Sequence, residues 1–260
     1  MIDPVAFEIG SISIRWYGII IACAFLLSTL LIIREAKKQG IEEDFILDLF
    51  IIMLPIAIIA ARLYFVIFQW SYYSQNPAEI LAIRSGGLAI HGGIIGGVIV
   101  LFLFSKKRKV SFLRITDLLV PYLALGQAIG RWGNFINREA FGGVVSEKFI
   151  SHFPGFIQEQ MYIRGNYYHP AFLYESIWNF IVFLSLIFLR RKEYIKRGDI
   201  FLLYIIGYSI GRFFIEGIRT DSLMLGPLRV AQIVSIIGII IASFVFYKRH
   251  AGSETKRRNK

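Results

Sequence analysis

Charged and polar side chains recur at regular intervals near the end of one apolar stretch, in the run YSIGRFFIEGIR. Tyr208, Arg212, Glu216 and Arg219 are spaced four, four and three residues apart, which places them on one face of a helix. Arg212 and Glu216 can therefore form an ion pair, which lowers the cost of an arginine at membrane depth. Two interpretations are open: the pair only fixes helix packing, or it offers a guanidinium to an anionic ligand while Glu216 orients it.

A second run, GQAIGRWGNFINREAFGG at residues 126–143, alternates glycines with polar residues. Arg131 supplies a planar fork of donors that suits phosphate oxygens, and Asn134 can donate or accept a hydrogen bond beside it. Glycines leave backbone groups open to a ligand. We therefore expect the chain to leave its apolar span near Gly130 as a binding segment; the alternative is a polar exit turn without a ligand.

A third polar residue, His91, stands in the glycine-rich run GGLAIHGGIIGG. Gly92 and Gly96 are four residues apart, and so are Gly93 and Gly97, a spacing that lets helices approach closely in a bilayer. Histidine has an ordinary pKa near 6.5, which makes His91 the natural candidate for proton transfer. The alternative is a histidine that is hydrogen-bonded only for packing.

The composition explains why these residues are unusual. The chain has 260 residues, of which 56% are hydrophobic and only 18% are charged, against about 45–50% and 25% in soluble domains. This predicts an integral membrane protein and excludes a disordered chain. The net charge of +11 is explained by basic residues at the ends of apolar stretches, so no nucleic acid is expected. Cys23 is the only cysteine, which excludes an intrachain disulfide, and no nucleotide, redox or metal signature is found, so no cofactor and no metal are expected.

The apolar stretches predict an all-α integral membrane fold with seven transmembrane helices in a single domain, residues 1–260. The predicted spans are Trp16–Ile33, Phe45–Phe68, Leu88–Phe104, Phe112–Ile129, Ala171–Leu189, Ile200–Ile215 and Val230–Tyr247. Most lysines and arginines fall after the first, third, fifth and seventh spans, which predicts an N-terminus outside and a C-terminus inside. Residues 130–170 then form a small extracytoplasmic subdomain, arm or lid.

With this topology the costly polar residues converge at the outer ends of the spans. Tyr17 begins the first span, Arg62 lies near the outer end of the second and His91 near that of the third. The remaining members are Arg131, Asn134, His169, Tyr174, Glu175, Tyr208, Arg212, Glu216 and Arg219. One outer pocket is therefore expected.

Five motifs, in this order, resemble the prolipoprotein diacylglyceryl transferase family. They are RWYG at residues 15–18, GGLAIHGG at 86–93, GRWGNFINREAFG at 130–142, HPAFLYE at 169–175 and YSIGRFFIE at 208–216. The resemblance implies a bacterial plasma-membrane enzyme with its active site toward the outer leaflet. Its reaction moves the diacylglyceryl group of phosphatidylglycerol to the lipobox cysteine thiol of a prolipoprotein and leaves glycerol phosphate.

The resemblance also implies roles for the residues that match its motifs. His91 corresponds to the essential histidine, and we expect it to take the thiol proton, because the thiolate is the nucleophile. Arg131 and Arg212 are expected to stabilise the leaving phosphate, with Arg219 as a third cation. The other expected substrate-binding residues are Tyr17, Asn134, Glu139, Gly142, Tyr208 and Glu216.

Two other classes of protein remain as alternatives from the residues alone. A seven-helix receptor or transporter for an anionic ligand is compatible with the number of spans. However, a transporter tends to have two related halves, which this chain does not show. A membrane structural protein would use the polar residues only to lock helices together. Covalent transfer to a lipobox peptide distinguishes the transferase from both.

Overall fold

The structure is a computed structural model that describes residues 2–10, 12–83 and 86–258. It divides into two compact units. Unit 1 combines Met1–Leu31 with Thr116–Lys260, and unit 2 is Ile32–Ile115. Each unit is mostly helical, and each is described separately below.

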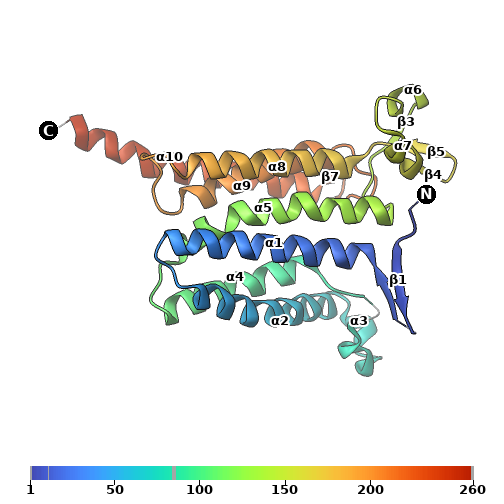
Figure 1. The fold of residues 1–260 in the computed structure, drawn as a ribbon, viewed down its shortest axis with the longest axis horizontal. Helices are drawn as coiled ribbons and strands as arrows, with labels where there is room; N and C mark the ends of the chain where they lie inside the picture. The colour runs from blue at the N-terminus through green and yellow to red at the C-terminus, as the bar shows by residue number, and fades with distance from the viewer. Residues whose placement is uncertain (1, 11, 84–85, 259–260) are drawn as a thin grey trace. The chain divides into compact units, whose positions relative to one another are not determined.

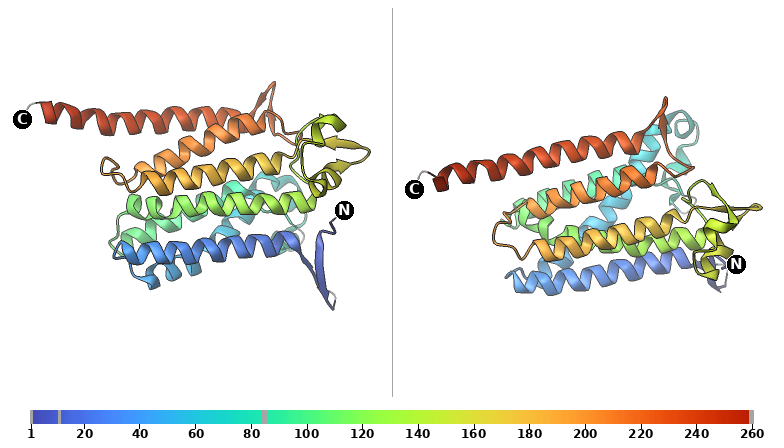
Figure 2. Two further views of the ribbon diagram at one scale, coloured as in Figure 1. Left: turned by 45° about the horizontal axis from the view of Figure 1, so that its top comes forward. Right: turned by 90° about the horizontal axis from the view of Figure 1, so that it is seen from above.

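Unit 1 is a layered set of long helices that run side by side (Figure 2). They are α1 (Trp16–Lys38, which belongs to unit 1 as far as Leu31), α5 (Phe112–Asn137), α8 (Ala171–Leu189), α9 (Asp199–Glu216) and α10 (Val230–Arg258). Buried apolar side chains hold α5, α8 and α9 together: Val120, Ala124, Val182, Leu186, Ile200 and Tyr204. Hydrogen bonds add to this packing, such as that from Ser176 Oγ on α8 to the Ala128 carbonyl on α5, 2.8 Å.

Short strands and helices cap one end of unit 1 (Figure 1). A hairpin of β1 (Val5–Ile9) and β2 (Ile12–Arg15) precedes α1. The head segment, residues 138–170, contains β3 (Val144–Val145), α6 (Glu147–Ile150), α7 (Gly155–Met161), β4 (Tyr162–Ile163) and β5 (Asn166–Tyr168), with strand order β3-β5-β4. A third hairpin, β6 (Met224–Leu225) and β7 (Leu228–Arg229), joins α9 to α10. The prediction of an all-α fold is therefore wrong in this respect, because the ends of the helices are closed by short antiparallel strands.

Apolar side chains fix the head segment to the helices below it. Ile150, Ile157 and Met161 are buried in one cluster with Phe135 of α5 and Phe172 of α8. Gln160 is also buried, and its side-chain nitrogen donates to the Phe135 and Ile136 carbonyls, 3.3 and 3.0 Å. The head segment is thus a packed part of unit 1.

Unit 2 consists of a helical hairpin and a connecting segment. The long helices are α2 (Glu43–Phe68) and α4 (Ile90–Lys107), and between them lie α3 (Trp70–Tyr73) and the 3₁₀ helix η1 (Pro77–Leu81). The glycine spacing predicted close packing, and this is confirmed at two positions. A Cβ atom at Gly96 would lie 2.6 Å from the Ala60 Cβ, and one at Gly92 would lie 2.9 Å from the Ala61 Cα.

Six of the described helices are long and apolar enough to cross a membrane: α1, α2, α4, α5, α8 and α10. The sixth predicted span is also a helix, α9, but it contains Asp199, Arg212 and Glu216 within its 18 residues and is not among the six. The helix of the fourth predicted span, α5, is longer than that span. Helix α5 continues to Asn137, so most of the expected exit segment after Ile129 is helical.

The packing of α4 on α2 gives a test with a matched control. Gly92→Ala places a Cβ against the backbone of α2, which cannot move aside as a side chain can, and such overpacking costs about 1–3 kcal/mol. In Gly97→Ala the new Cβ meets only Met53 side-chain atoms at 3.9 Å, and alanine gains up to about 1 kcal/mol in helix propensity. We expect a lower thermal unfolding midpoint in detergent for Gly92→Ala alone. Equal midpoints for the two variants would contradict close backbone packing.

Candidate active site

A buried glutamate on α8, Glu175, is in contact with three arginines of unit 1. Its Oε2 lies 2.6 Å from the Arg131 Nε of α5. Its Oε1 lies 3.5 Å from the Arg212 Nη1 of α9 and 3.3 Å from the Arg219 Nη1, just after α9. Arg131 lies near the last turn of α5, Glu175 near the first turn of α8, and Arg212 near the last turn of α9. Because neighbouring helices run in opposite directions, these three ends meet at one end of the unit.

The helical spacing of the late motif has the predicted consequence. Arg212 Nη2 lies 2.6 Å from Glu216 Oε2, so the expected ion pair between residues four apart is confirmed. The side chains of Glu175 and Glu216 are 5% and 3% exposed, whereas those of Arg131 and Arg212 are 22% and 21% exposed. The carboxylates are therefore buried behind the guanidinium groups, which retain access from outside the protein.

Arg219 connects this cluster to an exposed carboxylate. Its Nε and Nη2 donate to the two oxygens of Asp221, 2.9 and 2.7 Å. Burial opposes the charge of Arg219, but the hydrogen bond to Asp221 and the charges of Glu175, Asp221 and Glu216 outweigh it and raise its pKa. The same hydrogen bond lowers the pKa of Asp221. Arg219 therefore stays charged while it bridges a buried and an exposed carboxylate.

A short chain of hydrogen bonds extends the cluster along the end of α5. Arg131 Nη1 donates to Asn134 Oδ1, 3.2 Å, and Asn134 Nδ2 donates to Glu139 Oε1, 2.8 Å. Asn137 also donates to Glu139 Oε1, 3.4 Å. Asn134 is thus oriented on both sides, with its oxygen toward the arginine.

Gly142 joins the head segment to the end of α9. Its backbone N–H donates to the His169 carbonyl, 3.0 Å, and the Gly143 N–H donates to the Ile218 carbonyl, 2.9 Å. A Cβ at Gly142 would lie 2.6 Å from the His169 Cβ and 3.1 Å from the Ile218 oxygen. Only glycine allows the first part of the head segment, the residues before α8 and the residues after α9 to cross here.

The glycines of the run 126–143 have a different role from the expected one. Inside α5 their backbone groups belong to a helix, so they do not face a ligand as predicted. Cβ atoms at Gly126, Gly130 and Gly133 would instead meet Ser28, Ile21 and Tyr17 of α1, at 3.4, 3.1 and 2.7 Å. These glycines lie on one face of α5, and α1 packs against that face. The contact places Tyr17 against Gly133.

Two further residues of the site have aromatic partners. Tyr208 lies one turn before Arg212 and stacks on Tyr204, with ring centroids 5.8 Å apart. His169, in the motif before α8, has its Nδ1 3.2 Å from the Tyr174 hydroxyl. Burial lowers the pKa of His169, which favours the neutral ring at this contact.

His91 belongs to unit 2 and lies in the first turn of α4, where its side chain is exposed within that unit. Its ring centroid is 6.1 Å from that of Tyr64 on α2. The chain that leads into α4 is held by Arg62, which is 5% exposed. Arg62 donates to the carbonyls of Glu79, Ile80, Gly86 and Gly87 at 2.6–3.0 Å. The expectation that Arg62 belongs to the polar pocket is therefore replaced by a role in fixing the segment before His91.

The comparisons with known proteins agree with this arrangement of motifs. Residues 4–248 match the family model described as prolipoprotein diacylglyceryl transferase. The chain is 56% identical over 246 residues to the phosphatidylglycerol–prolipoprotein diacylglyceryl transferase of Clostridium novyi (strain NT), with 95% of both chains covered. It is 53% identical over 260 residues to the enzyme of the same name from Bacillus cereus (strain G9842), with 98% of this chain and 96% of that one covered.

The chain belongs to the prolipoprotein diacylglyceryl transferase family. Within this transferase, the structure brings together Arg131, Asn134, Glu139, Gly142, Arg212, Glu216 and Arg219 through the contacts given above. Tyr17 and Tyr208 lie on helices of the same unit, and His91 lies in the other unit.

Glu175 is the residue of the transferase site that sequence analysis did not select as a site residue. It was recognised only as one of several polar residues at the beginning of a span. An acidic side chain near the beginning of a strongly apolar helix was the available signal. Its partners were hidden because Arg131 and Arg212 come from other helices, so no spacing along the sequence connects them to it.

Replacement of the shared carboxylate is expected to destabilise the transferase strongly. Glu175→Gln keeps the shape but leaves three guanidinium groups without their common anion, and removal of one partner from a buried ion pair costs about 3–5 kcal/mol. Asp221→Asn is the matched control, because the Asp221 side chain is 49% exposed and exposed pairs contribute about 1 kcal/mol or less. Thermal unfolding in detergent measures both. A larger loss for Asp221→Asn would show that Glu175 is not the centre of the cluster.

The crossing at Gly142 gives a second test at neighbouring positions. Gly142→Ala forces apart the backbone next to Arg219 and should lower transfer activity at least tenfold, because small displacements of positioned groups are costly. Gly143→Ala should be tolerated, since a Cβ there meets nothing within 4 Å. Initial rates of purified variants in phosphatidylglycerol vesicles provide the measurement. Similar rates for both variants would mean that the crossing does not position the site.

Proposed function

We propose that this protein transfers the diacylglyceryl group of phosphatidylglycerol to the cysteine thiol of a prolipoprotein, and that the arginine cluster around Glu175 holds the phosphate. Family membership over residues 4–248 supports the reaction. The single observation that carries the assignment of the site is the meeting of Arg131, Arg212 and Arg219 on one buried carboxylate.

The reaction needs one bond to form and one to break. The cysteine sulfur attacks the glycerol carbon that carries the phosphate, a carbon–sulfur bond forms, and the carbon–oxygen bond breaks. The electron pair of that bond leaves on oxygen as glycerol phosphate, and the thiol proton passes to a base. The protein must therefore stabilise a thiolate and a phosphate that gains negative charge.

The arginines meet the second requirement. A guanidinium has five N–H donors in a planar fork, so an arginine that already binds a carboxylate can also donate to phosphate oxygens. Because charge grows on the phosphate as the bond breaks, fixed cations stabilise the transition state more than the bound lipid. Asn134, whose oxygen faces Arg131, has an amide that can bind the head group, and Tyr17, Tyr208, Glu139 and Gly142 complete the proposed substrate site.

His91 is the proposed base. A cysteine thiol has an ordinary pKa of about 8.5, so a group that accepts its proton raises the fraction of the reactive thiolate. An imidazole is suited to this role near neutral pH. The network of Arg62 supports the proposal indirectly, because it fixes the backbone that leads into the first turn of α4.

The proposed topology has seven spans, with the N-terminus outside and the C-terminus inside. The cluster lies where α5 and α9 end and α8 begins, and all three places are predicted to be outside. A different network joins the other end of α9 to α10. There, Arg249 and His250 of α10 pair with the buried Asp199 at 3.1 and 2.7 Å, near the basic residues predicted to be cytoplasmic. The Arg212–Glu216 pair lowers the cost of placing α9 across a bilayer. The head segment then lies outside the plasma membrane as an arm or lid over the site.

A reconstituted reaction tests this function. Purified protein, phosphatidylglycerol vesicles and a lipobox peptide should give a peptide whose mass increases by one diacylglyceryl group. His91→Gln should remain inserted and folded but lose transfer, at least 10²-fold for the loss of a general base. Mass spectrometry of the peptide provides the readout. Peptide binding without covalent change in the wild type would support a receptor or transporter instead, and near-normal turnover of His91→Gln would remove its role as the base.

A further inference from the structure

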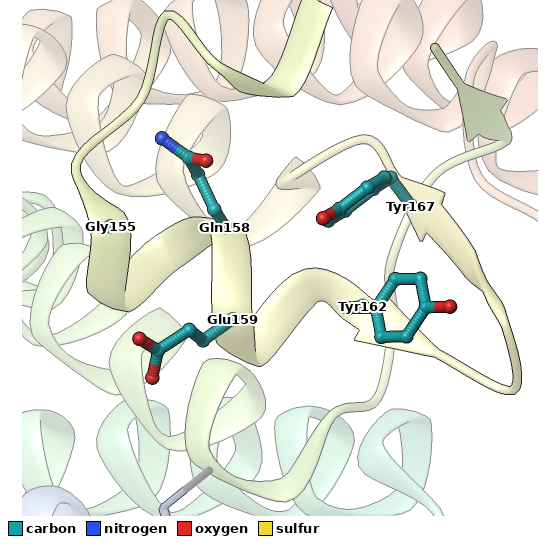
Figure 3. Close-up of a pocket in the computed structure, with 5 residues that line it drawn as sticks. All are labelled: Gly155, Gln158, Glu159, Tyr162 and Tyr167. Atoms are coloured by element: carbon teal, nitrogen blue, oxygen red, sulfur yellow. The ribbon is translucent and has the colours of Figure 1, made fainter. Parts of the chain in front are cut away.

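The head segment contains a pocket that the proposed reaction does not use (Figure 3). Its volume is about 330 Å³, and it is lined by Gly155, Gln158, Glu159, Tyr162 and Tyr167. This volume lies at the lower end of the range for small-ligand sites, about 300–1,000 Å³. It is suited to a single side chain or another small group.

The pocket is built on one face of α7. Gly155, Gln158 and Glu159 are spaced three and one residues apart, so they share one side of the helix, and Tyr162 follows α7 directly as the first residue of β4. Ile157, Gln160 and Met161 on the other side are buried against the core. Tyr167 is brought in by the sheet, because β4 and β5 pair Tyr162 directly with Tyr167. The lining residues are therefore held on a rigid base.

The pocket offers groups that attract a cation. The ring centroids of Tyr162 and Tyr167 are 4.8 Å apart, and tyrosine faces bind ammonium and guanidinium groups. The Gln158 Nε2 donates to the Phe153 carbonyl, 2.6 Å, and Figure 3 shows the side-chain oxygen turned toward Tyr167. Glu159 adds a negative charge on the same helix face, at the rim of the pocket, with its carboxylate directed away from the two tyrosines in Figure 3. The five lining residues include a carboxylate and no lysine or arginine.

The pocket is connected to the arginine cluster by the backbone. Tyr167 and Tyr168 of β5 are followed by His169, whose carbonyl accepts from Gly142 next to Arg219. A polypeptide whose cysteine reacts at the cluster continues into its mature segment at the outer side, where the head segment is proposed to lie. An extended chain advances about 3.3–3.6 Å per residue, so each residue after the cysteine carries the mature segment further from the cluster on the side proposed for the head.

We propose that this pocket binds a lysine or arginine side chain of the prolipoprotein, a short distance after the acceptor cysteine. The proposal rests on the proposed function, since it names a feature of the substrate of the same site. It assigns the head segment a part in substrate choice. It does not require the pocket residues to take part in bond formation.

A charge-swap experiment tests the pocket. Lipobox peptides carry lysine, norleucine or glutamate at successive positions after the cysteine, and transfer is measured in vesicles of phosphatidylglycerol alone. At one or more positions the wild type should show a KM two- to fivefold lower for lysine than for norleucine, the size expected for exposed cation–π and ion-pair contacts. Glu159→Lys should reverse the preference toward glutamate, with kcat for the norleucine peptide unchanged.

The control is Glu147→Lys, which makes the same charge change on α6 in the same segment but does not line the pocket. It should keep the preference for lysine. Tyr162→Leu, at an exposed position, should weaken that preference without reversing it.

Equal KM values for lysine and norleucine in the wild type, or the same reversal in Glu147→Lys, would overturn the proposal. Loss of the preference on adding phosphatidylethanolamine would assign the pocket to a lipid amine and would also overturn it. If no peptide is lipidated at all, the proposed function itself fails, which is a separate result.

Discussion

The site depends on one carboxylate that is shared by three arginines. Three guanidinium groups that lie close together repel one another, and within unit 1 Glu175 makes their approach possible because it contacts all three. The same contact ties α5, α8 and the end of α9 together at the point where they meet. A buried ion pair is rarely the cheapest way to stabilise helices. The proposed function accounts for its presence here, because an apolar contact of equal size would hold the helices and leave no cations for the phosphate of the proposed substrate.

Close backbone approach is the second constraint, and glycine provides it in both units. In α5 a glycine face seats α1 and brings Tyr17 to the helix that carries Arg131, whereas in α4 Gly92 and Gly96 seat α2. Gly142 allows three chain segments to cross beside Arg219. At Gly92 and Gly142 an added methyl group would meet the backbone of a neighbouring segment, whereas on α5 it would meet side chains of α1. The glycines of the motifs therefore serve mainly to fix the elements that carry the polar residues.

Particular residues show which features of this structure can be predicted from the sequence. The Arg212–Glu216 pair was predictable because both partners lie on one helix, four residues apart, and the helix period relates them directly. The starts of α1, α5, α8 and α10 were predictable from the beginnings of apolar stretches. The central role of Glu175 was not predictable, because its arginine partners come from other parts of the chain and meet it only through tertiary packing. The helical course of residues 130–137 was missed because glycine and asparagine disfavour helices locally, and contact with α1 outweighs that preference.

The charge balance of the cluster relates its architecture to the proposed chemistry. The cluster combines three partly exposed arginines with two buried glutamates, Glu175 and Glu216, and these five groups have a formal charge of plus one. Asp221 and Glu139 are exposed, where water and salt screen their charges. A phosphodiester carries one negative charge, which matches this excess, and the leaving phosphate monoester gains further charge as the carbon–oxygen bond breaks. With fewer carboxylates the cluster would bind the intact lipid and the product alike too tightly; with more it would lose the attraction for the growing charge. Two buried glutamates for three arginines therefore suit a site that must favour the transition state over both.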